Sequence, residues 1–91
     1  MGKRDISKHA HDRIKERGLS FGFVRDVVSG RVRSVRLSTK RPNCIILTAL
    51  GNKNIAWSII YDTKRNKVIT VRWAHEKEKR CYEKKYKTHK R

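Results

Sequence analysis

Two histidines and two arginines lie close together near the start of the chain, in residues 7–18 (SKHAHDRIKERG). Histidine transfers protons near neutral pH, and the planar guanidinium of arginine matches phosphate oxygens. A helix turns about 100° per residue, so Arg13 and Arg17 lie about 40° and 80° from His9 around its axis. His11 lies about 200° away. His9, Arg13 and Arg17 therefore form one basic row, and His11 points elsewhere.

The basic row borders the apolar side of the same helix, where Ala10 and Ile14 must pack on the rest of the protein. In a catalytic interpretation, His9 is a general acid or base, and the arginines hold a phosphate and stabilise charge in a transition state. In a noncatalytic interpretation, this is a surface helix whose arginines bind phosphates passively. Spacing alone favours the noncatalytic interpretation, because helices with two arginines are common in nucleic-acid-binding proteins.

The whole chain is strongly basic, with 25 Lys and Arg against 8 Asp and Glu and a formal net charge of +17 over 91 residues. Such a chain repels itself, so an anionic partner is expected to stabilise it. Nucleic acid is the first expectation, because Lys and Arg contacts with phosphates release counterions. An acidic protein is the second. A membrane is not expected, because no segment pairs a basic face with a strongly apolar one.

The histidines and cysteines do not predict a metal or a cofactor. His9 and His11 diverge on a helix, and no third ligand of a suitable type lies nearby in the sequence. Cys44 and Cys81 fit neither a metal-binding spacing nor a disulfide framework, so a core residue and a free thiol are expected. The start of the chain lacks an apolar signal region, and the longest apolar run is too short to span a bilayer. We therefore expect a cytoplasmic protein without a cofactor.

Two helices and then strands are expected to position the basic row. Ser7 and Gly18 are typical of the start and end of a helix over 8–17, and Ser20 and Gly30 delimit a second helix. Beyond it the sequence is rich in β-branched and aromatic residues, which predicts four strands, at 31–38, 44–50, 55–62 and 67–74. Short connections favour an antiparallel meander, with the arginine-rich first strand at an edge.

A basic segment, residues 75–91, closes the chain and is expected to form a helix or tail with a thin apolar stripe at Tyr82 and Tyr86. Length and composition predict one domain over 1–91, with a core over 7–74. The predicted fold class is α+β, with two N-terminal helices followed by a four-stranded antiparallel sheet and a basic C-terminal helix. The helices are expected to pack on one face of the sheet.

The strands supply further candidate substrate-binding residues, namely Tyr61, Thr70, Arg72 and, just after the last strand, His75. Because side chains alternate along a strand, Thr70 and Arg72 are expected to share one face with Val68. This face would be open to RNA if the opposite face packs on the helices. A solvated sheet face without a function is the alternative.

The opposite face of the last strand is expected to carry Ile69, Val71 and Trp73. Trp57 and Trp73 both stand in apolar strands. Large aromatic side chains are mostly buried, so both tryptophans are expected in the core rather than stacked on bases.

The order of these motifs resembles a small bacterial and phage domain family of unknown function. The resemblance rests on His9-Ala10, Arg13, Arg17-Gly18-Leu19-Ser20, a valine-rich helix ending at Gly30, and the closing run Val68-Ile69-Thr70-Val71-Arg72-Trp73. It covers about residues 7 to 74. That family is grouped with metal-independent ribonucleases and toxins of the barnase, EndoU, colicin and RelE kinds. The resemblance therefore implies a RelE- or colicin-nuclease-like fold and RNA cleavage.

The resemblance further implies a toxin-like endoribonuclease, in which the RNA 2′-hydroxyl attacks the adjacent phosphate. His9 is then the candidate acid or base, and Arg13 and Arg17 stabilise charge. The second acid or base stays open between Tyr61, His75 and an arginine. The expected partners are RNA, including the ribosome or tRNA, and an acidic antitoxin. A noncatalytic nucleic-acid-binding module and a basic protein that docks an acidic partner are the alternatives.

Overall fold

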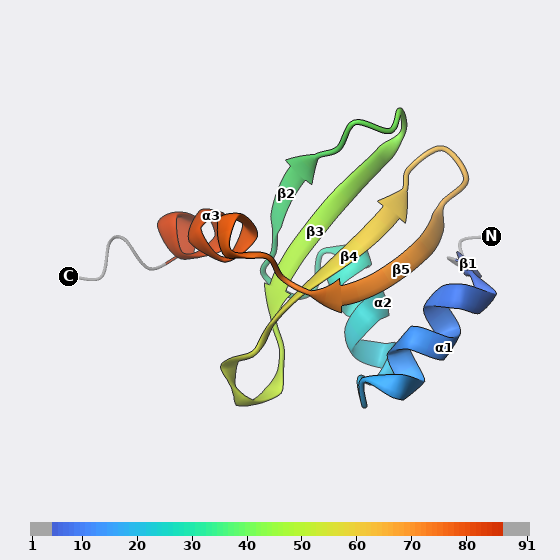
Figure 1. The fold of residues 1–91 in the computed structure, drawn as a ribbon, viewed down its shortest axis with the longest axis horizontal. Helices are drawn as coiled ribbons and strands as arrows, with labels where there is room; N and C mark the ends of the chain where they lie inside the picture. The colour runs from blue at the N-terminus through green and yellow to red at the C-terminus, as the bar shows by residue number, and fades with distance from the viewer. Residues whose placement is uncertain (1–4, 87–91) are drawn as a thin grey trace.

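A computed structural model describes residues 5–86 of the chain, so the predicted continuation of the C-terminal helix over 87–91 lies outside the described residues. Over these residues the fold is α+β, with three helices and a five-stranded sheet in which four strands form the predicted antiparallel part (Figure 1). The elements in chain order are β1 (Asp5–Ile6), α1 (Lys8–Glu16), α2 (Phe21–Ser29), β2 (Val35–Ser38), β3 (Cys44–Leu50), the 3₁₀ turn η1 (Asn52–Asn54), β4 (Ala56–Asp62), β5 (Lys67–Trp73) and α3 (Glu76–Tyr86).

The first two helices begin and end where their capping residues predict. The Ser7 hydroxyl accepts a hydrogen bond from the Ala10 N–H at 3.0 Å, and the Ser20 hydroxyl accepts one from the Phe23 N–H at 2.9 Å. Gly18 and Gly30 follow the helices with φ of 69° and 87°, a left-handed conformation that a side chain would strain. Both helix boundaries are thus determined by local chemistry.

The sheet has the strand order β1-β5-β4-β3-β2, and β2 to β5 form the expected antiparallel meander. The element order differs from the prediction at its start, because β1 precedes the helices and pairs in parallel with β5. Two residues are too few to show a strand period, so this element left no signal in the sequence. The arginine-rich strand β2 is at the other edge, as predicted, but begins only at Val35.

A β-bulge in β5 overturns the simple alternation predicted for that strand. Ile60 pairs with Thr70 and Tyr61 pairs with Val68, which leaves Ile69 without a partner in β4. The extra residue reverses the side-chain direction below it. Val68 therefore lies in the core together with Val71, and it does not share a face with Thr70 as expected.

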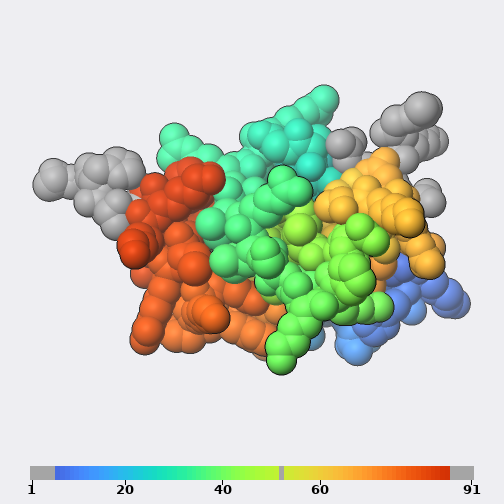
Figure 2. Space-filling view, turned by 90° about the horizontal axis from the view of Figure 1, so that it is seen from above, coloured from blue at the N-terminus to red at the C-terminus, as the bar shows by residue number. Residues whose placement is uncertain are grey.

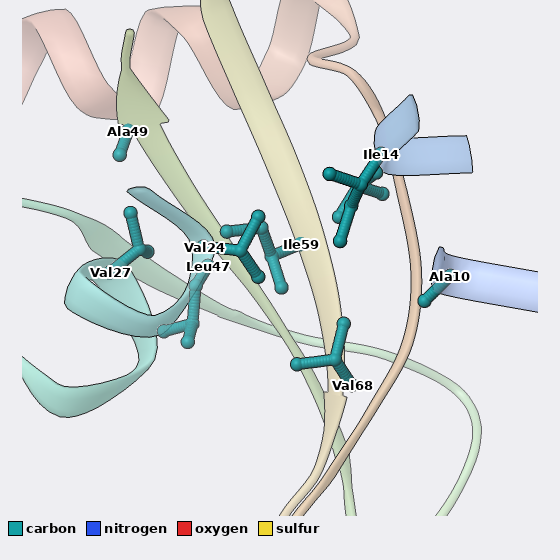
Figure 3. Close-up of a cluster of buried hydrophobic side chains, with 9 residues drawn as sticks. Ala10, Ile14, Val24, Val27, Leu47, Ala49, Ile59 and Val68 are labelled. Carbon is teal, nitrogen blue, oxygen red and sulfur yellow. The ribbon is translucent and has the colours of Figure 1, made fainter. Parts of the chain in front are cut away.

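The core lies between one face of the sheet and helices α1 and α2 (Figure 3). Its buried side chains come from α1, α2, β3, β4 and β5. They are Ala10, Ile14, Val24, Val27, Leu47, Ala49, Ile59, Val68 and Val71. Cys44 is buried as predicted, and Cys81 is a free thiol. Because Ala10 and Ile14 are completely buried, the side of α1 that faces the sheet is fixed.

Helix α3 lies on the other face of the sheet, contrary to the prediction that all helices share one face. The Glu78 side chain accepts hydrogen bonds from Ser58 and Arg72, which alternate with the core residues Ile59 and Val71. The Tyr86 hydroxyl donates a hydrogen bond to the Ser34 carbonyl, which ties the end of α3 to the segment before β2. Figure 2 shows α3 and the β4–β5 turn at opposite ends of the molecule. Polar contacts together with the buried Tyr82 attach α3, and of these the apolar pattern indicated only the tyrosine.

The two N-cap serines differ in their tertiary contacts, which gives a test of the fold. Ser7 also donates a hydrogen bond from its hydroxyl to the Ile69 carbonyl at 2.8 Å, whereas Ser20 is exposed and caps only its own helix. We expect Ser7→Ala to lower the free energy of unfolding by about 2 kcal/mol and Ser20→Ala by about 1 kcal/mol. Urea denaturation followed by circular dichroism measures both. Equal losses would mean that the bond to Ile69 contributes nothing.

Candidate nucleic-acid interface

The basic row lies along the exposed border of α1, as its helical angles predict. His9 is exposed, and Arg13 and Arg17 are partly exposed, while Ala10 and Ile14 beside them are buried. The helix rises about 1.5 Å per residue, so His9 and Arg17 are separated by about 12 Å along the axis. One phosphate is too small to contact both ends of the row. An extended backbone with successive phosphates fits this length.

Arg13, in the middle of the row, forms an ion pair on its own helix. Its Nη1 lies 2.8 Å from the Glu16 Oε1, and both side chains are partly open to solvent. Exposed pairs of this kind contribute little to stability, typically less than about 1 kcal/mol. A phosphate can therefore displace Glu16 from Arg13 at little cost.

Arg17, at the end of the row, stacks on Trp73 from the end of β5. Its guanidinium carbon lies 4.8 Å from the centroid of the Trp73 ring, which is the geometry of a cation–π contact. The Arg17 Nε–H is buried and has no hydrogen-bond partner in the part of the chain that the structure describes. The stacking therefore orients this guanidinium while its terminal N–H groups can still bind an anion.

Trp73 is 59% exposed, so the prediction that it packs in the core is wrong. Trp57, its partner across the β4–β5 pair, is only 5% exposed and confirms the corresponding prediction. The difference follows from their places in the sheet. Trp57 lies in a strand with neighbours on both sides, whereas β1 pairs with β5 only at Lys67 and Val68. The end of β5 is thus an uncovered edge.

His11 is separate from the basic row, as the angular argument predicts. It is exposed, and its ring centroid lies 4.6 Å from that of Phe21 in α2. His11 therefore lies on the α2 side of the helix.

Arg72, predicted as a substrate contact, is paired with a carboxylate that the sequence analysis missed. Its two terminal nitrogens donate to the Glu78 carboxylate at 2.8 and 2.9 Å. The Ser58 hydroxyl and the His75 backbone N–H also donate to Glu78, at 2.7 and 2.8 Å. Ser58 shares a further hydrogen bond with Thr48. In this arrangement the Arg72 guanidinium neutralises a buried carboxylate instead of facing solvent.

The pKa of Glu78 is determined by its burial and by these hydrogen-bond donors. Burial raises the pKa of the carboxyl, but hydrogen bonds from Arg72, the His75 N–H and Ser58, together with the Arg72 charge, lower it to about 2 from 4.5. The carboxylate is 6% exposed and stays ionised because its donors replace water. One glutamate among many charges in the last segment gives no sequence signal of its own. Only its neighbours in space distinguish it.

The remaining predicted residues do not gather around His9. Tyr61 lies on the helix-facing side of the sheet and donates a hydrogen bond to Asn66 in the β4–β5 turn. Thr70 pairs with Ile60 on the opposite face. The exposed His75 ring lies just before α3, with Nδ1 4.0 Å from the Glu78 Oε2. Of the side-chain hydrogen bonds between described residues, none joins His9 to another predicted site residue.

Neither a metal site nor a membrane helix is found in residues 5–86. No group of three or more His, Cys, Asp or Glu side chains in that range could hold a metal ion. Within the same range, no helix has the length and apolar character needed to cross a membrane.

Comparison with known proteins gives no neighbour for this chain, since no family model, no curated protein and no solved structure matches it. The resemblance described above therefore stays a prediction that rests on the motif residues alone.

The depressed pKa of Glu78 makes a contribution to stability that depends on pH. Because the folded pKa, about 2, is below the ordinary 4.5, this contribution is complete above about pH 4.5 and is lost as the pH falls toward 2. Glu78→Gln removes it. Between about pH 5 and pH 2, we expect the unfolding free energy of the wild type to fall by up to about 3 kcal/mol more than that of the variant.

Urea denaturation at a series of pH values measures this difference. Glu83→Gln is the matched control, because Glu83 is an exposed glutamate on the same helix. It should keep the pH dependence of the wild type. Parallel pH profiles for the wild type and Glu78→Gln would contradict the assigned role of the carboxylate.

Proposed function

We propose that this protein binds RNA along the basic row and the adjacent end of β5. The observation that carries the proposal is the contact between Arg17 and Trp73, which combines a phosphate-binding group with an exposed aromatic ring. The net charge of +17 supports a polyanionic partner. The row is long enough for an extended strand to place successive phosphates against Arg13 and Arg17.

A second candidate function is metal-independent cleavage of the bound RNA. It is favoured by the position of His9, an exposed histidine one helical turn from Arg13 on the same side of α1. In this reaction the 2′-oxygen attacks the adjacent phosphorus and the bond to the 5′-oxygen breaks, leaving a 2′,3′-cyclic phosphate. The 2′-hydroxyl proton passes to a base and the 5′-oxygen receives a proton from an acid. His9 is proposed for one of these transfers, and Arg13 stabilises the charged phosphate.

This proposal includes the wider expectations raised by the sequence. We include in the proposal a RelE- or colicin-nuclease-like fold and a toxin-like cytoplasmic ribonuclease. The arrangement of two helices on an antiparallel meander supports both. An acidic antitoxin could mask the basic row until RNA is to be bound. The RNA would be that of the ribosome or a tRNA, and no cofactor is proposed.

Binding is tested with a 2′-O-methyl RNA strand, which cannot undergo attack by its own 2′-oxygen. We expect Arg13→Ala and Arg17→Ala each to weaken binding several-fold and to reduce the slope of log K against log salt by about 0.7. Fluorescence anisotropy over a range of salt concentrations measures both quantities. Arg25→Ala is the charge-matched control, since Arg25 is exposed on α2 outside the row. The same loss in all three variants would contradict binding along the row.

Cleavage is tested separately on unmodified RNA in excess EDTA. We expect His9→Ala to abolish product formation while its affinity for the 2′-O-methyl strand changes little, because the histidine transfers protons rather than holding the strand. His11→Ala is the internal control and should cleave at the wild-type rate, because His11 lies on the α2 side. Cleavage that EDTA abolishes, or full activity of His9→Ala, would leave RNA binding as the function without this chemistry.

A further inference from the structure

An apolar groove lies beside Trp73, on the side of the molecule where β5 leads into α3. It has a volume of about 950 Å³ and is lined by the connection between β3 and β4, the end of β5 and one side of α3. Its principal lining residues are Leu50, Ile55, Ala56, Trp73, Lys79 and Tyr82. We refer to it as the Trp73 groove.

The Trp73 groove holds the most exposed apolar surface of the described chain. Trp73 and Ile55, at 59% and 41% exposure, are the exposed large hydrophobic side chains among residues 5–86, and both line the groove. Trp57 contacts Trp73 with ring centroids 6.1 Å apart and ring planes tilted by 40°, so the two rings are not stacked face to face. Exposed apolar surface of this kind marks a binding site when something on its rim selects a partner.

Basic groups over the Trp73 ring and in the groove lining favour an anionic partner. Arg17 lies over the ring but does not line the groove, so it reaches the ring from outside the cavity. Lys79 of α3 lines the groove, and Lys53 is exposed in the neighbouring turn η1. Glu83 is the acidic residue in the lining. The groove therefore offers an aromatic platform with cations nearby, which fits a base and its flanking phosphates.

We propose that the Trp73 groove binds an unstacked base of single-stranded RNA. The base stacks on the Trp73 ring, and its flanking phosphates contact Arg17 on one side and Lys79 on the other. This inference rests on the proposed function and specifies its substrate class. Bases inside an A-form duplex are stacked and paired, so they cannot enter the groove, whereas single-stranded segments can splay a base out. Helix α3 forms the second wall, held in place by the Glu78 carboxylate.

The experiment compares three labelled ligands of equal length by fluorescence anisotropy: a 2′-O-methyl single strand, the same backbone without bases, and a duplex. Stacking of one base should make the single strand bind roughly tenfold more tightly than the abasic strand. Trp73→Ala should remove this difference, in addition to any loss of affinity that both strands share because Arg17 no longer stacks on the ring. Lys79→Ala is the matched contrast, because it should weaken both strands by the same factor and lower the salt slope.

Two results of the strand comparison would overturn the inference while RNA binding stands. One is equal affinity of the wild type for the single strand and the abasic strand. The other is retention of the full difference by Trp73→Ala, provided that circular dichroism shows the variant to be folded. Quenching of Trp73 fluorescence by polyglutamate as strongly as by the single strand would assign the groove to an acidic protein and also overturn it. Failure of every RNA to bind would overturn the proposed function itself.

Discussion

The burial of the apolar side of α1 against β5 is the contact on which the rest of the structure depends. Ala10 and Ile14 are fully buried over Val68 and Val71, and the Ser7 hydroxyl fixes the start of the helix to the Ile69 carbonyl. A helix anchored in this way cannot rotate, so its charged border has only one place to lie. The same packing that excludes water from the core therefore directs the basic row along the edge of the sheet.

Strand β5 also organises the opposite face, by a different kind of interaction. There the Arg72 guanidinium and the Glu78 carboxylate form a paired, hydrogen-bonded contact that ties α3 to the sheet. An unpaired carboxylate at this site would be costly to bury, so Ser58 and the His75 N–H complete its coordination. One strand thus connects a helix held by apolar packing with a helix held by a polar network and the buried Tyr82. Their meeting point is the exposed end of β5, at Trp73.

The charge of the protein has a structural consequence as well as a functional one. With an excess of 17 positive charges, most basic side chains must remain on the surface, where water and salt screen their repulsion. Two acidic residues form ion pairs in contrasting surroundings. Glu16 pairs with Arg13, and Glu78 pairs with Arg72. The first pair is exposed and replaceable by an anion, whereas the second is buried and belongs to the fold.

The sequence by itself determined the features that depend on neighbours along the chain: both serine caps, both glycine stops, the limits of β3, and the separation of His9 from His11. Helical angles and capping hydrogen bonds act within a few residues. Only the tertiary structure decided the bulge at Ile69, the exposure of Trp73, and the pairing of Arg72 with Glu78. Each of these depends on what lies across the sheet or beside its edge, and a local sequence pattern does not show which residues meet there.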